Sequence, residues 1–325
     1  MEKRDLRIIF MGTPDFAVES LRILLENEYN VVGVITSPDR QSGRGRKINE
    51  SAVKKFAVEK GLTILQPEKF KNENFLAELK ALNANLQIVV AFRMLPEIVW
   101  DMPEYGTFNL HGSLLPQYRG AAPINWAIIN GEKESGITTF FIEKEIDTGN
   151  ILFQQKVAIK PTDNAEVLHD NLMKEGGKLV LKTVKAIEEN DYTKTSQNQY
   201  FKNEKELKPA PKIFKNDCKI DWTKDVKDIY NFIRGLSPYP CAWMELKGEN
   251  GKEISVKIYE TEMLDKKSKL NLETDNKTYL NIVTETGTIS VKEFQIAGKK
   301  RMKIEDYFRG NSLEGFRLNK TDTIV

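Results

Sequence analysis

The 325-residue sequence contains few of the residues that build metal sites and disulfide frameworks. It has two cysteines, Cys218 and Cys241, and two histidines. The cysteines form no Cys-x-x-Cys pair and no histidine cluster flanks them, so we expect neither a zinc site nor a disulfide scaffold. We therefore expect a protein that needs no metal and works in a reducing compartment, the cytoplasm.

Long apolar runs are also missing. No segment approaches the roughly eighteen consecutive apolar residues of a membrane span, and the charged opening leads into a short apolar run rather than a signal peptide. Hydrophobic residues make up 40% and charged residues 30% of the chain, which is an ordinary globular balance. Because the length exceeds that of a usual single domain, we expect two domains. We further expect a monomer without a membrane partner.

The chain lacks a marked excess of charge and the common nucleotide-binding motifs. Its net charge of +2 does not by itself indicate a nucleic-acid binder, because such binding needs a localised basic surface. The glycine at position 12 belongs neither to a GxGxxG motif nor to a phosphate-binding loop, and Gly43 and Gly45 lack the required spacing. We therefore expect no nucleotide cofactor.

Short β-rich runs alternate with helical patterns through the first half of the chain. Because apolar residues recur with strand and helix periods in turn, the pattern predicts successive strand–helix units. The predicted strands lie at 6–10, 31–35, 63–65, 86–91, 107–111, 137–142 and 151–159, and the predicted helices at 17–25, 51–60, 74–82 and 164–189. This alternation predicts an α/β domain with a mostly parallel sheet that helices cover.

A polar, lysine-rich stretch follows the last of these helices, and Pro209 and Pro211 lie near its end. Such a composition is typical of a linker. Beyond it we predict a helix and then short strands separated by Gly, Asn and Lys turns, which indicate a small β-barrel. The expected helix lies at 225–234 and the strands at 242–246, 254–259, 279–283 and 288–294. We therefore place a first domain at 1–189, a linker at 190–205 and a second domain at 206–325.

Asn109 and His111 are the most informative polar residues of the first domain. Side chains alternate along a strand, so these two point the same way while Phe108 and Leu110 point to the other side. Their strand ends at Gly112, and open parallel sheets bind ligands beyond the carboxyl ends of their strands. Taken alone, however, the pair is better explained by a turn-capping asparagine and a core histidine.

Several carboxylates follow the next predicted strand. Glu143, Glu145 and Asp147 come after the strand at 137–142, whose end we expect beside that of the first. An Asn–His–Asp set provides an amide donor, an imidazole that ionises near neutral pH, and a carboxylate that orients or charges the imidazole. Such a set suits acyl transfer to an amine, because a tetrahedral oxyanion needs donors and the amine must lose a proton.

The residues around this set resemble the folate-dependent formyltransferases. The stretches NLHGSLLPQYRGAAPINWAIINGE at 109–132 and SGITTFFIEKEIDTGNIL at 135–152 look like the signature of that family, and RIIFMGTPDFA at 7–17 matches it too. A β-rich second domain after a linker is similar to the members that act on tRNA, so the resemblance reaches nearly the full length. It implies a Rossmann-like domain followed by an OB-like β-barrel.

The resemblance also implies roles for individual residues. The catalytic set would be Asn109, His111 and Asp147, and the residues that line the site of the formyl donor, 10-formyltetrahydrofolate, would be Ser113, Leu114, Leu115 and Pro116. The acceptor would be the free amino group of methionyl-initiator tRNA, for translation initiation. One segment departs from the family: Phe92-Arg93-Met94 stands where many relatives carry Tyr-Gly and two further residues. Its contacts with folate are left open.

A basic segment follows the second strand, with four cations and one acid between positions 39 and 47. Such a run is more often a solvated surface loop, but this one leaves the sheet at the same end as the proposed site, where cations could follow RNA phosphates. The resemblance implies that this loop meets the acceptor stem of tRNA, with Arg44 singled out. The expected tRNA contacts are Arg40, Arg44, Arg46 and Lys47, and the second domain is also expected to contact tRNA.

Two other kinds of function stay open. A sugar-nucleotide N-formyltransferase or a glycinamide ribonucleotide transformylase would share the Asn–His–Asp chemistry, although the segment 119–123 and the basic loop resemble the tRNA enzymes better. An inactive folate- or RNA-binding module would keep the sheet, loop and barrel without turnover. The intact set at Asn109, His111 and Asp147 argues against this second alternative.

Overall fold

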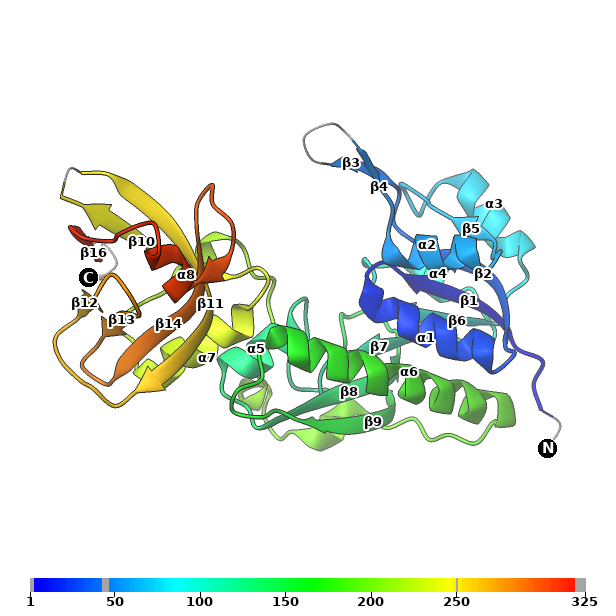
Figure 1. Ribbon diagram of the computed structural model, residues 1–325. Coiled ribbons are helices and arrows are strands. Elements are labelled where there is room, and N and C mark those ends of the chain that lie inside the picture. Colours follow the sequence, from blue (N-terminus) through cyan, green and yellow to red (C-terminus); the bar gives the residue numbers. More distant parts are fainter. Residues whose placement is uncertain (1–2, 43–46, 250, 319–325) are drawn as a thin grey trace. The chain divides into compact units, whose positions relative to one another are not determined.

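Figure 1 shows the computed structural model, which describes residues 3–42, 47–249 and 251–318. The contacts divide the chain into two compact units. Unit 1 runs to Gly120 and adds Ser135–Ala158 and His169–Pro209; unit 2 comprises Ala121–Glu134, Ile159–Leu168 and the chain from Ala210 onward. Two short segments from within the predicted first domain therefore belong to the second unit. The expected continuous limits, 1–189, 190–205 and 206–325, stay a prediction.

The sheet of unit 1 has the strand order β5-β2-β1-β6-β7-β8-β9. Its strands are β1 (Arg7–Gly12), β2 (Asn30–Ile35), β5 (Ile64–Leu65), β6 (Leu86–Val90), β7 (Thr107–His111), β8 (Glu134–Phe141) and β9 (Ile151–Ala158). The neighbouring strands β5, β2, β1, β6 and β7 pair in parallel in this order. β8 then pairs with β7 in the antiparallel direction. All of β6 is buried, as expected for a parallel strand with both faces covered. The predicted Rossmann-like, mostly parallel sheet is confirmed.

Helices connect these strands or, in the case of the last one, follow the sheet (Figure 1). They are α1 (Asp15–Glu26), α2 (Ala52–Glu59), α3 (Glu73–Ala81), α4 (Glu97–Trp100) and α6 (Ala165–Glu189). Gly12 lets α1 follow β1 tightly, because a Cβ atom there would lie 2.6 Å from the Cβ of Ala17. Ser51 and Asn72 cap α2 and α3 by accepting backbone N–H bonds. A hydroxyl contact of 2.8 Å between Thr139 and Thr183 joins β8 to α6.

The segment after β2 contains two short strands where we predicted a surface loop. β3 (Arg40–Ser42) and β4 (Lys47–Asn49) pair as an antiparallel hairpin. Asp39, at its base, forms an ion pair with Lys54 and accepts a 2.9 Å bond from Gln66. These strands were not predicted, because they are short and polar and lack an apolar alternation.

Unit 2 is built on an antiparallel sheet of strand order β12-β13-β14-β11-β10-β16, with β15 paired to β14. The edge strands β12 and β16 are in contact, so the sheet nearly closes and the predicted β-barrel is confirmed. Its strands are β10 (Ala242–Gly248), β11 (Glu253–Leu264), β12 (Asn271–Thr274), β13 (Leu280–Val283), β14 (Thr288–Ile296), β15 (Met302–Lys303) and β16 (Phe316–Leu318).

Helices and a buried core complete unit 2. Its helices are α5 (Pro123–Ile129), α7 (Val226–Leu236) and α8 (Ile304–Phe308), and α5 packs against α7. The core includes Trp222, Ile233, Met244 and Phe294. Three short 3-10 helices, η1 (Gln197–Tyr200), η2 (Glu204–Glu206) and η3 (Asn216–Cys218), lie in the polar region between α6 and α7. Because α5 has only seven residues, it was not predicted.

Candidate active site

The site begins at the carboxyl end of β7, where His111 is the last strand residue. His111 is buried, with a relative exposure of 6%, whereas Asn109 is partly exposed. The His111 ring meets Phe140 edge-on, with 6.5 Å between ring centroids, and its Nε2 lies 2.9 Å from the carbonyl oxygen of Tyr118. Because a carbonyl only accepts, Nε2 carries the proton of this bond. The imidazole is therefore fixed from two sides.

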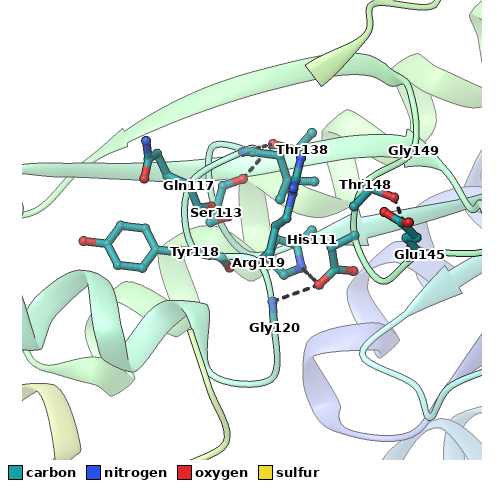
Figure 2. Close-up of polar contacts among 12 residues, drawn as sticks. His111, Ser113, Gln117, Tyr118, Arg119, Gly120, Thr138, Glu145, Thr148 and Gly149 are labelled. Carbon is teal, nitrogen blue, oxygen red and sulfur yellow. Dashed lines mark hydrogen bonds and ion pairs between the residues drawn. The ribbon is translucent and has the colours of Figure 1, made fainter. Parts of the chain in front are cut away.

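The loop after β7 is tied to the neighbouring strands by polar contacts (Figure 2). Thr138 on β8 donates to the Ser113 carbonyl at 2.7 Å and accepts from the Leu115 N–H at 3.1 Å. Gln154 on β9 donates to the Leu115 carbonyl at 2.8 Å. These contacts reach across two strands of the sheet, so the loop has a single defined path away from His111.

The residues predicted to line the folate site lie together in this loop. Ser113, Leu115 and Pro116 are buried and Leu114 is partly buried. The Ser113 hydroxyl donates to the Gln117 carbonyl at 2.6 Å. Since that hydroxyl proton is committed within the loop, a donor bond from Ser113 to a ligand would have to come from its backbone.

Asp147 reaches His111 by a route that the sequence did not predict. We expected the end of the strand at 137–142 to lie beside the end of β7, and this is wrong. β8 runs antiparallel to β7, so the Ile142 N–H instead donates to the Thr107 carbonyl at the opposite end of β7. The following loop returns, and an Asp147 carboxylate oxygen lies 3.8 Å from His111 Nδ1. The predicted meeting of Asp147 and His111 occurs through this loop.

The carboxylate of Asp147 has a second fixed contact. The same oxygen accepts the Gly120 N–H at 2.9 Å, and the dashed lines from Gly120 and from His111 meet at this oxygen in Figure 2. The Asp147 backbone has φ +55°. Gly149 follows closely, where a Cβ atom would lie 1.8 Å from the Phe141 carbonyl oxygen, so only glycine fits. The other carboxylates of this loop point elsewhere: Glu143 accepts from Asn150 at 3.1 Å, and the Glu145 side chain is exposed.

Two residues outside the predicted set complete the surroundings of Asp147. The Arg119 guanidinium donates twice to the side-chain oxygen of Gln197, at 3.0 and 2.6 Å, and the Gln197 amide donates to the backbone carbonyls of Asp147 and Gly149. Burial lowers the pKa of Arg119, and the Asp147 carboxylate opposes that shift. Arg119 lay in the matched stretch, but Gln197 lies in the polar region read as a linker, where nothing in the sequence marked it.

The loop after β6 is held by Arg93, the residue that departs from the family pattern. Its guanidinium lies 4.0 Å from the ring centroid of Phe70 and donates to the backbone carbonyls of Pro67 and Glu68. β6 pairs with β7 through Val89 and Asn109. The Arg93 loop therefore leaves the sheet beside the catalytic strand, while the Met94 side chain is 72% exposed.

The predicted tRNA contacts are only partly described. Arg40 begins β3 and is exposed. Lys47 begins β4, and only its backbone is described. Arg44 and Arg46 lie outside the described residues. The structure therefore places the predicted basic segment on the β3–β4 hairpin through Arg40 and the backbone of Lys47.

Two further features concern cofactors and membranes. Within residues 3–42, 47–249 and 251–318, no group of three His, Cys, Asp or Glu side chains is arranged to hold a metal ion. Cys218 and Cys241 are free and buried, and burial raises the pKa of the Cys241 thiol to about 11.

Over the same part of the chain, no helix has the length and apolar character needed to cross a membrane.

A Rossmann-like sheet that is followed along the chain by a β-barrel agrees with the family comparison. Residues 6–184 match the formyl transferase family and residues 212–312 match the formyl transferase C-terminal domain. The chain belongs to the formyl transferase family. The predicted resemblance is confirmed, and with it the prediction of an enzyme that transfers formyl groups.

Two relatives and one solved structure are similar to this chain over most of its length. The methionyl-tRNA formyltransferase of Phocaeicola vulgatus is 59% identical over 314 residues, which cover 95% of this chain and 97% of the relative. That of Bacteroides thetaiotaomicron is 56% identical over 323 residues, 98% of this chain and 100% of the relative. Among solved structures, the sugar 3N-formyl transferase WlaRD, studied with dTDP and 5-N-formyl-THF, has a TM-score of 0.64 and 24% identity, covering 91% of this chain and all of that one. At this identity the likeness concerns the fold alone.

Proposed function

We propose that this protein transfers the formyl group of 10-formyltetrahydrofolate to the amino group of methionine esterified to initiator tRNA. The observation that carries the proposal is the contact of 3.8 Å between the buried His111 and the partly buried Asp147 at the end of β7. It is supported by relatives named methionyl-tRNA formyltransferase that match nearly the full chain. The reaction belongs in the cytoplasm, where charged tRNA and reduced folate meet. The expected monomer stays a prediction.

The first chemical step makes the new carbon–nitrogen bond. The lone pair of the methionine amine attacks the formyl carbon, and the π electrons of the formyl group move to its oxygen, which becomes an oxyanion. Asn109 shares the face of His111 on β7, so we assign its amide N–H as a donor to that oxyanion. Preorganised donors of this kind stabilise the charge that develops in the transition state.

The nitrogen that attacks must lose a proton, and His111 is placed to take it. Its Nε2–H is committed to the Tyr118 carbonyl, so Nδ1 holds the free lone pair. A proton taken up at Nδ1, directly or through a water, creates an imidazolium beside the Asp147 carboxylate. The intermediate then collapses: the bond from carbon to folate N10 breaks, N10 takes the proton, and tetrahydrofolate and the formamide remain.

The folate site is assigned to the loop that begins directly after His111. Ser113, Leu114, Leu115 and Pro116 follow the catalytic strand, and their loop is held by Thr138 and Gln154. A fixed loop at this position would offer its backbone groups to a ligand at low entropic cost. This placement brings the donor carbon close to the reacting amine.

Choice of acceptor must come from contacts remote from the reacting atoms. The set only requires an uncharged amine near a formyl carbon, so it does not itself separate methionyl-tRNA from an amino sugar. We assign the remote contacts to the basic segment with Arg40, Arg44, Arg46 and Lys47 and to the second unit. Cations along these segments would bind phosphates and use RNA binding energy to position the amine.

An assay with several acceptors tests the proposal. The full-length protein is supplied with 10-formyltetrahydrofolate and, separately, methionyl-initiator tRNA, a nucleotide-linked amino sugar, glycinamide ribonucleotide or free methionine. We expect rapid formylation of the tRNA and slow reaction of the small amines. Formylation of the amino sugar with the tRNA left unmodified would instead assign the protein to the sugar-formylating enzymes, and no formylation at all would indicate a binding module.

A further inference from the structure

The Gln197 side chain uses its full hydrogen-bonding capacity although it comes from a polar, predicted linker region. It is buried, with 2% relative exposure. Its oxygen accepts both N–H bonds from Arg119, and its nitrogen donates at 2.9 Å to each of the carbonyls of Asp147 and Gly149. A primary amide has two donor hydrogens and two acceptor lone pairs, and all four are occupied.

Arg119 determines which way this amide faces. A guanidinium only donates, so the oxygen of Gln197 must face Arg119 and the NH2 group must face the two carbonyls. The reversed amide would oppose donors to donors and acceptors to acceptors. Because a guanidinium keeps its positive charge in proteins and Arg119 is partly buried, its bonds to Gln197 are charge-assisted. The pair therefore has one arrangement.

The segment that carries Gln197 is fastened to the same unit. Thr195 exchanges two backbone hydrogen bonds with Ile151, the first residue of β9, at 2.8 and 2.9 Å. Ser196 then caps η1 through its side chain. Gln197 is thus the first residue of a short helix whose start is fixed beside the loop that ends at β9.

The two carbonyls that Gln197 holds belong to the turn that presents Asp147. Asp147 has φ +55°, a region that residues with a side chain rarely adopt and that the surroundings must maintain. From this conformation its carboxylate reaches the Gly120 N–H and faces His111 Nδ1. Without the two bonds from Gln197, the turn at 147–149 would be free to relax and move the carboxylate away.

We propose that Gln197, oriented by Arg119, is a positioning residue for formyl transfer. It holds the turn at 147–149 so that the Asp147 carboxylate stays against His111. The inference rests on the proposed function, since it matters for turnover only if Asp147 supports catalysis. Its side-chain bonds go to Arg119, Asp147 and Gly149, so Gln197 acts on His111 through Asp147.

The test replaces Gln197 by methionine, which has a similar length and no amide. The matched control is Gln199→Met, an exposed glutamine on the same short helix. We expect Gln197→Met to lower kcat by about 10- to 100-fold, since small misplacements of a reacting group are this costly, with the KM values for tRNA and folate within about twofold. The control keeps kcat, and thermal unfolding shows whether each variant folds.

A double-mutant cycle with Asp147→Asn distinguishes an effect of Gln197 through Asp147 from a structural effect that does not involve Asp147. If Gln197 acts through Asp147, then Gln197→Met lowers kcat no more than about twofold further in the Asp147→Asn background, because coupled residues are not additive. Losses that multiply in the double variant, or a Gln197→Met enzyme with normal kcat, would overturn the inference. If Asp147→Asn alone keeps wild-type kcat, the proposed catalytic set fails instead. Should Gln197→Met not fold, Arg119→Lys gives the same cycle, because it keeps the charge but loses the two-pronged bond.

Discussion

The two histidines of this protein both lie beside aspartates, yet the two pairs differ in how far their side chains are buried. The His111 side chain is 6% exposed, and its partner Asp147 is 13% exposed. The His169 side chain, on α6, is 27% exposed; it lies 3.0 Å from Asp170 and 3.8 Å from Asp15, which are 63% and 74% exposed. By distance alone, His169 has the closer aspartate.

The difference shows that proximity to a carboxylate does not make a catalytic pair. His111 is fixed by the Tyr118 carbonyl and by Phe140, and Asp147 is fixed by the Gly120 N–H. The aspartates at His169 are mostly exposed, so solvent screens their charges, and His169 itself is more exposed than His111. A site is therefore distinguished by immobilised partners rather than by one short distance.

The largest effect is expected from breaking the fixed pair. His111→Ala and Asp147→Asn should each lower kcat for methionyl-tRNA formylation by about a hundredfold or more, because charge stabilisation in the transition state is lost. The Asn variant keeps an oxygen that can accept the Gly120 N–H. Folate binding, measured by fluorescence or calorimetry, should change little. Near wild-type turnover in either variant would remove the pair from the mechanism.

A smaller effect is expected at the loop after β6, which the Arg93 side chain holds. Arg93→Ala removes the contact with Phe70 and the bonds to the carbonyls of Pro67 and Glu68. Loss of a cation–π contact worth about 1 kcal/mol should raise the KM for the formyl donor roughly fivefold, with a smaller change in kcat. Steady-state kinetics at saturating tRNA would check this, and an unchanged KM would show that the loop does not meet the donor.

Loss of the exposed cation Arg40 should have a smaller effect, and that effect on tRNA binding should depend on salt. Arg40→Ala removes one charge at the start of β3, and exposed ionic contacts are worth about 0.2 to 1 kcal/mol. We therefore expect a KM for tRNA raised by about two- to fivefold at low salt, with no change for folate. The slope of log affinity against log salt should fall by about 0.9 for one lost phosphate contact. A salt-insensitive affinity would exclude this hairpin from RNA binding.

The smallest effect is expected at the second histidine. His169→Ala should leave kcat and both KM values within about twofold of wild type, because an exposed pair contributes little. The same assay that detects the loss in His111→Ala provides the comparison under identical conditions. A large loss of turnover in His169→Ala would break the contrast between the two histidines.

Much of the fold could be predicted because its strands are apolar and periodic. The strand at Thr107–His111 matches its predicted limits, and its alternation correctly separates the His111 face from that of Phe108. The helix at Ala165–Glu189 was also predicted to within one residue. Periodicity did not reveal that β8 runs antiparallel to β7, since a strand pattern carries no information on direction.

The parts that could not be predicted depend on tertiary contacts of polar residues. The region around Gln197 has the composition of a linker, and composition does not show that one of its amides is buried with four bonds. The short helix α5 gains its place by packing on α7, about a hundred positions later in the sequence. Asn109 and His111 were candidates from strand alternation, and the family resemblance selected Asp147 among three carboxylates; the return of the loop after β8 explains how His111 and Asp147 meet.

The most direct test measures one turnover of formyl transfer with enzyme in excess, using methionyl-initiator tRNA and a nucleotide-linked amino sugar as competing acceptors. Wild-type protein and Asp147→Asn are compared after both are shown to bind folate and tRNA. We expect formylation of the tRNA by the wild type and a rate at least about a hundredfold lower in the variant. Equal rates in the two proteins, or formylation of the sugar in preference to the tRNA, would contradict it.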